Sequence, residues 1–221
     1  MNFFSHQSIF FTVLGYSMSY LEFFGTVAGG VAVFLSAKAN VWSWPLGIIN
    51  VVLFFFLFYQ VQLYPDMFLQ VFFFITNLMG WWRWKNPSYE EEDKKHELKV
   101  SRMPINTWLF FLAIGLIGTI AFGALAKNLS SFFPVLFSKP SAFPYADSFV
   151  TVMSMVATYL MVQKKVECWL VWILVDVVAC YLYFSKEIKF VGIEYLVFCF
   201  IAAFGFWHWL QEYKENQLDK P

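Results

Sequence analysis

Long apolar stretches separated by short polar connections run through most of this 221-residue chain. A membrane-spanning helix needs about 20 consecutive, mostly apolar residues. Seven stretches approach or meet that length and are predicted to be transmembrane helices: 21–38, 43–61, 65–84, 104–126, 147–163, 167–185 and 190–210. A charged loop, 85–103, follows the third stretch, a Pro/Ser/Phe-rich connection, 127–146, follows the fourth, and a polar tail, 211–221, ends the sequence.

The first 20 residues are apolar but irregular, because Ser, Gln, Thr and Gly interrupt the run. We predict that segment 1–20 is a helix lying in the membrane interface rather than an eighth span. The first Lys or Arg of the sequence is Lys38, so the N-terminus lacks the basic region of a cleavable signal peptide.

Basic residues fall mainly on one side of this predicted topology. With seven spans the connections alternate between the two sides, and one side receives eleven Lys and Arg residues where the other receives four. Cytoplasmic connections carry the excess of Lys and Arg. The loop 85–103 and the C-terminus are therefore predicted to be cytoplasmic.

Composition narrows the class of protein further. Hydrophobic residues make up 60% of the chain and charged residues 14%, against roughly 45–50% and about 25% in soluble domains. Such a composition excludes a soluble globule and a disordered chain. Lys+Arg and Asp+Glu both number 15, so no positive excess favours nucleic acid. Three Cys and three His form no closely spaced set, and GxxxxGK[ST] is missing. We therefore expect no metal, no cofactor, no catalytic residues and no ATP hydrolysis.

An internal repeat changes the interpretation. Shifted by 125 residues, the sequence aligns with itself over 21–84 with fourteen identities, twelve of which are not Phe. The matched pairs include Trp44/Trp169, Gly80/Gly205 and Trp84/Trp209. The copies begin four spans apart, so they cross the membrane in the same direction. The predicted fold is an all-α integral membrane protein with two parallel three-helix repeats joined by a linker helix. Carriers of the SWEET type share this arrangement, and such repeats place a substrate site at their interface.

Polar residues within the spans are candidates for that site. Asp176 lies about nine residues into the sixth span, where an unpaired acid is costly and is usually functional. Trp169, Trp172 and Asp176 share one helix face by their i, i+3, i+7 spacing. Two indoles beside a carboxylate suit a flat, cationic, sugar-bearing ligand. The alternative is that both Trp residues are interfacial anchors, which is as plausible for Trp169 and less so for Trp172.

Amides in the first repeat add to this set. Gln70 and Asn77 share a face of the third span, and Asn50 lies in the second. An amide can donate to and accept from ribose hydroxyls or a carboxamide. Taken singly, each is explained slightly better by interhelical hydrogen bonding, worth about 0.6 kcal/mol on average. Tyr195, the repeat counterpart of Gln70, is expected to complete the pocket.

Three strings of residues carry a resemblance to a known family. They are WPLGIINV at 44–51, QLYPDMFLQVFFFITNLMGWWRW at 62–84, and the stretch 147–183 with its ExWxxW pattern. With these strings the sequence resembles the PnuC family of nicotinamide riboside transporters over roughly 20–210.

That resemblance implies a full-length SWEET-like fold of three, one and three helices, a homotrimer, and a place in the bacterial cytoplasmic membrane. It implies facilitated diffusion of nicotinamide riboside, with trapping by a cytoplasmic ribosylnicotinamide kinase. The family's binding residues correspond here to Trp169, Trp172, Asp176, Gln70 and Asn77, and also to Asn50 and Tyr195.

Other functions stay open from the sequence. Relatives of this family are assigned to thiamine or riboflavin, and thiamine is also a cationic aromatic. An ion or proton channel using Asp176 is an alternative of another class, although an ion path gains little from indoles. A membrane-embedded assembly protein is a further alternative, against which the internal repeat argues.

Overall fold

Seven α-helices and a short β-hairpin make up most of the computed structural model, which describes residues 5, 7–13, 16–62, 64–132, 142–187 and 189–218. The predicted segments 1–20, 127–146 and 211–221 each include residues outside these ranges. The helices are α1 (Tyr20–Ala37), α2 (Ser43–Gln60), α3 (Tyr64–Lys85), α4 (Ile105–Phe132), α5 (Pro144–Val162), α6 (Cys168–Ser185) and α7 (Lys189–Leu218). The chain divides into two separately packed units, 1–99 and 100–221.

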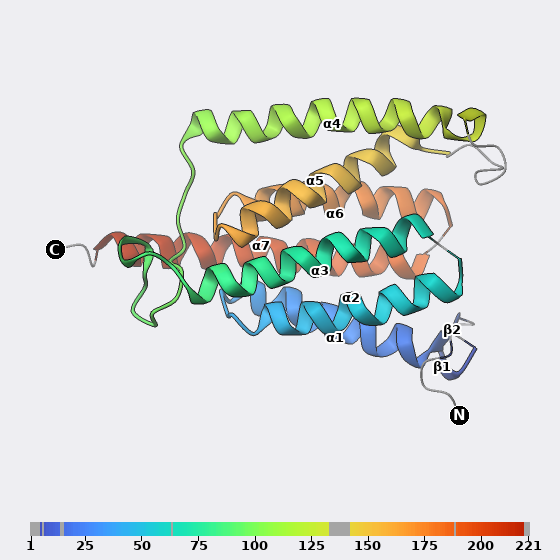
Figure 1. Cartoon of the computed structure of the whole chain (residues 1–221), viewed down its shortest axis with the longest axis horizontal. Coiled ribbons are helices and arrows are strands. Elements are labelled where there is room, and N and C mark those ends of the chain that lie inside the picture. The colour runs from blue at the N-terminus through green and yellow to red at the C-terminus, as the bar shows by residue number, and fades with distance from the viewer. Residues whose placement is uncertain are drawn as a thin grey trace. The chain divides into compact units, whose positions relative to one another are not determined.

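The N-terminal segment corrects one prediction. Instead of an interfacial helix, β1 (Ile9–Val13) and β2 (Tyr16–Ser19) pair antiparallel beside the start of α1 (Figure 1). The prediction of a helix was wrong because Ile, Phe, Thr and Val dominate β1, and β-branched and aromatic residues fit a pleated surface. The hairpin is tied to α1 by a hydrogen bond from the Tyr16 hydroxyl to the Glu22 carboxylate.

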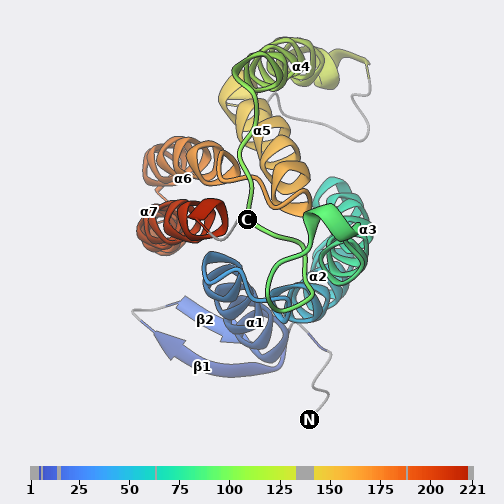
Figure 2. The same ribbon diagram turned by 90° about the vertical axis from the view of Figure 1, so that its left-hand side faces the viewer.

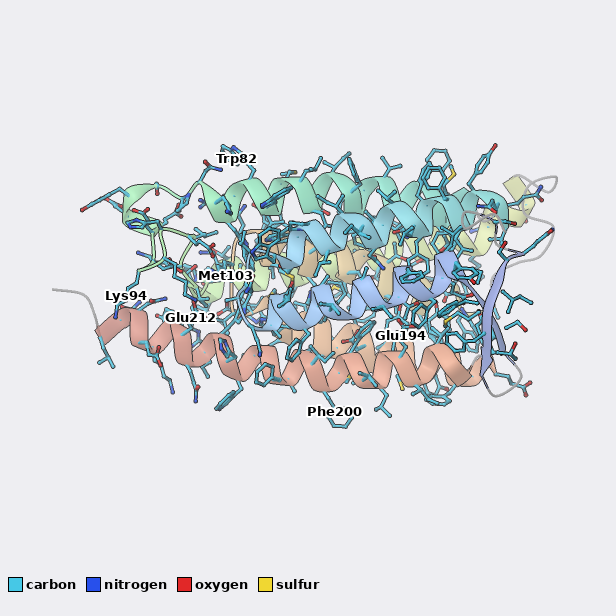
Figure 3. All side chains as sticks on the ribbon, turned by 90° about the horizontal axis from the view of Figure 1, so that it is seen from below. Trp82, Lys94, Met103, Glu194, Phe200 and Glu212 are labelled. Carbon is cyan, nitrogen blue, oxygen red and sulfur yellow. The ribbon has the colours of Figure 1, made fainter. Side chains whose placement is uncertain are left out.

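Six described helices are long and apolar enough to cross a membrane: α1, α2, α4, α5, α6 and α7. Helix α3 is equally long, with 22 residues, but Asp66, Gln70 and Asn77 lie within it and lower its hydropathy. Large apolar side chains on the helices point outward, as Trp82 and Phe200 do in Figure 3, and both are more than half exposed. This outward apolar surface is what a multi-pass membrane protein presents to lipid.

In the first unit, α2 packs against both α1 and α3. Its core includes the buried side chains of Leu21, Trp44, Val51 and Trp84. The charged segment after α3 is folded rather than freely solvated. It forms a 3-10 turn, η1 (Tyr89–Glu91), and a bridge between Glu92 and Leu98, and Leu98 is only 3% exposed.

In the second unit, α4 lies along α5, and α5, α6 and α7 pack in sequence order (Figures 1 and 2). Small residues allow the close approach of α4. A side chain at Gly115 would meet the sulfur of Met153 at 2.3 Å, and one at Gly118 would meet Val152 at 3.0 Å. Pro144 occupies the first turn of α5, where its missing N–H costs nothing.

The sequence repeat is also a repeat of backbone geometry. Helices α2 and α6 begin and end 125 residues apart, at 43 and 60 against 168 and 185. The turns before them each contain a left-handed residue, Ala39 and Lys164, both at φ 51°. The turns after them contain Gln62 and Glu187, at φ 60° and 61°. The left-handed residue closes the preceding helix in both copies.

Candidate functional site

A tryptophan pair closes one end of the first repeat. The indoles of Trp44 on α2 and Trp84 on α3 meet edge to face, with ring centroids 5.1 Å apart at 89°. A Cβ at Gly80 would lie 2.4 Å from the Trp44 ring, so glycine is required for this contact. We call this arrangement of two indoles and a glycine the tryptophan clamp.

The second repeat builds the same clamp one copy later. Trp169 on α6 and Trp209 on α7 meet edge to face at 5.5 Å and 90°, and a Cβ at Gly205 would lie 2.7 Å from the Trp169 ring. The Trp169 side chain is only 1% exposed. Its indole is therefore engaged in packing between α6 and α7, and a contact with substrate stays a prediction for this residue.

The remaining part of the predicted α6 face carries Trp172 and Asp176. Trp172 is half-buried, and its indole Nε1 has no hydrogen-bond partner among the described residues. Asp176 is 3% exposed, and within the described parts of the chain no hydrogen bond or ion pair reaches its carboxylate. One turn of helix separates the two side chains, so an unused donor and an unused acceptor lie on one face.

Two residues of α7 border this face of α6. Cys199 lies close enough to interact electrostatically with Asp176, and its thiol is 3.8 Å from the carbonyl oxygen of Ile173. Tyr195 stacks on Tyr183 of α6, with ring centroids 5.3 Å apart and planes at 11°. Tyr183 follows Asp176 by seven residues, so Tyr195 lies two turns along the same stripe of α6.

In the first unit, Asn50 connects two helices. Its Nδ2 donates to the carbonyl oxygen of Gly25 on α1 at 2.8 Å. A Cβ at Gly29 would lie 2.7 Å from the same nitrogen, so the amide fills a space left by a glycine. The interhelical role considered for this amide is thus observed, while its role in substrate binding stays a prediction.

Asn77 is held in a comparable way. Its Nδ2 donates to the carbonyl oxygen of Phe73 on its own helix at 2.7 Å. Its Oδ1 lies against Gly47 of α2, where a Cβ would approach it to 2.1 Å. The amide oxygen is therefore fixed at the α2–α3 contact.

Gln70 lines a cavity of about 270 Å³ between α2 and α3. The other lining residues are apolar or aromatic: Val51, Val52, Phe55, Phe56, Val71 and Phe74. Within the described part of the chain Gln70 makes no hydrogen bond. The surface that faces this cavity is apolar, so a role of the Gln70 amide in substrate binding stays a prediction.

The seven predicted residues are divided between the two units. Asn50, Gln70 and Asn77 lie in the first unit; Trp169, Trp172, Asp176 and Tyr195 lie in the second. The structure adds two glycines, Gly47 and Gly29, whose missing side chains make room for the amides. The repeat alignment could have pointed to one of them. Gly47 aligns with Trp172, so the first repeat has a glycine where the second repeat has a predicted binding residue.

Binding is the chemistry that these groups support. Indole and phenol rings offer stacking, amides offer paired donors and acceptors, and the carboxylate offers charge. Among the described residues no group of three or more His, Cys, Asp or Glu side chains could hold a metal ion.

Comparison with known proteins gives consistent matches over nearly the whole chain. The family model described as nicotinamide mononucleotide transporter matches residues 19–211. The nicotinamide riboside transporter PnuC of Escherichia coli strain K12 is 34% identical over 237 aligned residues, covering 98% of this chain and 97% of that protein. The riboflavin/roseoflavin transporter RibM of Streptomyces davaonensis is 26% identical over 188 residues, covering 84% and 82%.

A solved structure shows the same fold. A crystal structure of the vitamin B3 transporter PnuC matches with a TM-score of 0.66 at 22% identity, covering 89% of this chain and 83% of that chain.

Proposed function

The chain belongs to the PnuC family of membrane transporters, which are not enzymes, and on that premise we propose that it carries nicotinamide riboside by facilitated diffusion. The observation that carries the proposal is the 34% identity to a nicotinamide riboside transporter over 98% of the chain. The family resemblance inferred from the sequence strings is confirmed by these matches. The substrate and the passive mechanism are the proposal.

Recognition of the substrate is assigned first to the α6 face. The Trp172 indole stacks on the nicotinamide ring, and the Asp176 carboxylate balances the positive charge of the pyridinium. Support comes from the burial of Asp176 without a partner among the described residues, since an unpaired buried carboxylate is costly unless a ligand uses it. Gln70, Asn77, Asn50, Tyr195 and Trp169 complete the proposed pocket.

The proposed topology has seven spans, with two parallel three-helix repeats joined by α4. The equal spacing of the helix bounds and of the left-handed residues supports the parallel repeat. Helix α3 is included as a span because its polar residues, Gln70 and Asn77, are assigned to the substrate pocket rather than to lipid.

The cellular setting is proposed on the same premise. The protein lies in the bacterial cytoplasmic membrane as a homotrimer, with its C-terminus in the cytoplasm, as the eleven-to-four distribution of basic residues indicates. A cytoplasmic ribosylnicotinamide kinase adds a phosphate to the substrate, and the added charge prevents its return. Uptake then needs no ion gradient, because consumption of the substrate maintains the inward flow.

Riboflavin is a second candidate substrate, because a relative 26% identical over 84% of the chain is a riboflavin/roseoflavin transporter. Riboflavin is neutral and larger than nicotinamide riboside, so it makes less use of Asp176. Thiamine shares the cationic aromatic character and is the third vitamin to be compared.

Uptake into liposomes that hold the purified protein tests the proposal, with no ATP and no ion gradient. Labelled nicotinamide riboside, thiamine and riboflavin are compared side by side. We expect saturable entry of nicotinamide riboside that stops at equal concentrations inside and outside. Entry of another vitamin alone would change the substrate, and accumulation that requires an imposed gradient would contradict facilitated diffusion.

A further inference from the structure

Residues 100–103, just before α4, lie along the turn between α5 and α6. The backbone N–H of Ser101 donates to the carbonyl oxygen of Lys164 at 3.1 Å, and the N–H of Val166 donates to the carbonyl oxygen of Ser101 at 3.0 Å. The Lys165 amine donates to the Ser101 hydroxyl at 2.8 Å. We call residues 100–103 the strap. It is a short parallel pairing that holds the turn leading into α6.

One carboxylate fastens the strap to the helix itself. Glu167 is the residue that precedes α6, and it is only 5% exposed. Its Oε2 accepts a hydrogen bond from the backbone N–H of Met103 at 3.2 Å, and its Oε1 accepts one from Arg102 Nε at 3.3 Å. Its carbonyl oxygen accepts the N–H groups of Leu170 and Val171, in the first turn of α6. Glu167 therefore joins the strap to that turn.

The first repeat builds the same turn without this anchor. The counterpart of Glu167 is Trp42, whose side chain is 64% exposed. The backbone N–H of Trp42 donates to Oδ1 of the nearby Asn40 at 2.9 Å. The backbone hydrogen bonds of the two turns correspond, and the tryptophan clamp follows in both. Neither the turn nor the clamp needs a strap in order to form.

The strap therefore serves something that only the second repeat has. Among the residues that differ between α6 and α2 after this turn are two of the predicted binding residues: Trp172, where α2 has Gly47, and Asp176, where α2 has Val51. We propose that Glu167 is a positioning residue, which fixes the first turns of α6 through the strap so that Trp172 and Asp176 are held in place for substrate. This inference rests on the proposed function, because it assigns that site its support.

A charge is less important in this role than an acceptor. Most of the Arg102 side chain is exposed, at 55%, so its attraction to Glu167 is screened by water. The Met103 N–H, in contrast, has a buried acceptor in Glu167. Glutamine keeps an oxygen for that N–H, and alanine removes it. The two substitutions at Glu167 are therefore expected to differ.

The test measures KM and Vmax for nicotinamide riboside in liposomes, with the amount of folded, inserted protein determined for each variant. We expect Glu167→Ala to raise KM about 10-fold while Vmax per folded protein stays within about 2-fold, since a misplaced binding group weakens recognition. Glu167→Gln is expected to stay within about 3-fold of wild type. Trp42→Ala, at the counterpart position of the first repeat, is the matched control and should leave KM unchanged.

A second variant breaks the hydrogen bond between Met103 and Glu167 by removing its donor instead of its acceptor. Met103→Pro removes the N–H donor and leaves the carboxylate, and it should raise KM as Glu167→Ala does. Unchanged KM in either folded variant would overturn the inference, as would a loss confined to the quantity of folded protein. Wild-type protein that takes up no nicotinamide riboside would instead overturn the proposed function, so the two failures are distinguishable.

Discussion

At the level of Trp44 and Trp169 the two repeats are built alike, and at the level of Asn77 they diverge. Each clamp has an edge-to-face indole pair over a glycine, with ring centroids 5.1 Å apart in the first repeat and 5.5 Å in the second. Farther along, Asn77 rests against Gly47, whereas the corresponding positions in the second repeat hold Ala202 and Trp172.

The pattern of likeness and divergence separates packing from recognition. Positions that are equal in both copies satisfy the same requirement twice, and that requirement is the contact between neighbouring helices. Positions that differ within an equal backbone are free to serve a ligand. Val51 and Asp176 make the point, because both are buried, at 5% and 3%, in equivalent places on α2 and α6. Because valine fills this buried position in the first repeat, packing of the equivalent position in the second repeat does not require a carboxylate.

The largest expected effect is on the clamps. Gly80→Ala and Gly205→Ala each place a methyl group within 3 Å of a buried indole, so the helices must separate. Overpacking of this kind costs about 1–3 kcal/mol. We expect both variants to lower the melting temperature in detergent. Gly30→Ala is the control, because a Cβ there meets nothing within 4 Å, and it should leave the melting temperature unchanged. A wild-type melting temperature in both clamp variants would show that the clamps are dispensable.

Asp176 gives the largest expected effect on ligand binding, whereas the clamps affect folding. Asp176→Asn should lower the preference for cationic over neutral ligands by about 10- to 100-fold, the worth of roughly 1.5–3 kcal/mol for a hydrogen bond to a charged group. Competition binding with nicotinamide riboside and a neutral nucleoside measures it. Asp176→Val copies the first repeat and should fold at least as well as wild type while losing the cation preference, since a buried unpaired charge is costly and a buried valine is not. An unaltered preference in either variant would remove charge from the mechanism.

Trp172 gives a smaller effect. Trp172→Ala should weaken binding of nicotinamide riboside by about 2- to 30-fold, the range of a cation–π contact worth roughly 0.5–2 kcal/mol. Calorimetric titration of the folded protein measures the change. Trp207→Ala is the control, because its side chain is 54% exposed, and it should bind as wild type does. Equal affinity in Trp172→Ala and wild type would make this residue an anchor only.

Much of this architecture can be predicted from the sequence, because the length of the apolar stretches and the internal repeat can be read from the chain alone. The spacing of 125 residues that relates Trp44 to Trp169 also relates the ends of α2 and α6. The β-hairpin was missed because hydropathy does not distinguish a short apolar strand from a helix. Helical spacing places Trp169 and Trp172 on one side of α6 but says nothing of the neighbour that Trp169 contacts, Trp209. The anchoring role of Glu167 depends on a strap 64 residues away in sequence.

The smallest effect concerns the folded segment 86–99, which follows α3 in the first unit. The hydrogen bond from Arg83, with a smaller one from Ser88, holds the pKa of Glu91 below its usual 4.5. A carboxyl group with a lowered pKa in the folded state adds stability above its unfolded pKa and loses it as the pH falls through the folded value. Protection of the 86–99 amides from hydrogen exchange, measured relative to the intrinsic exchange rate at each pH, should therefore fall below about pH 4.5. Arg83→Gln should lower this protection slightly at pH 7 and flatten its pH dependence, with substrate affinity unchanged. Identical exchange in Arg83→Gln and wild type at both pH values would show that this ion pair, 43% exposed at Glu91, contributes nothing.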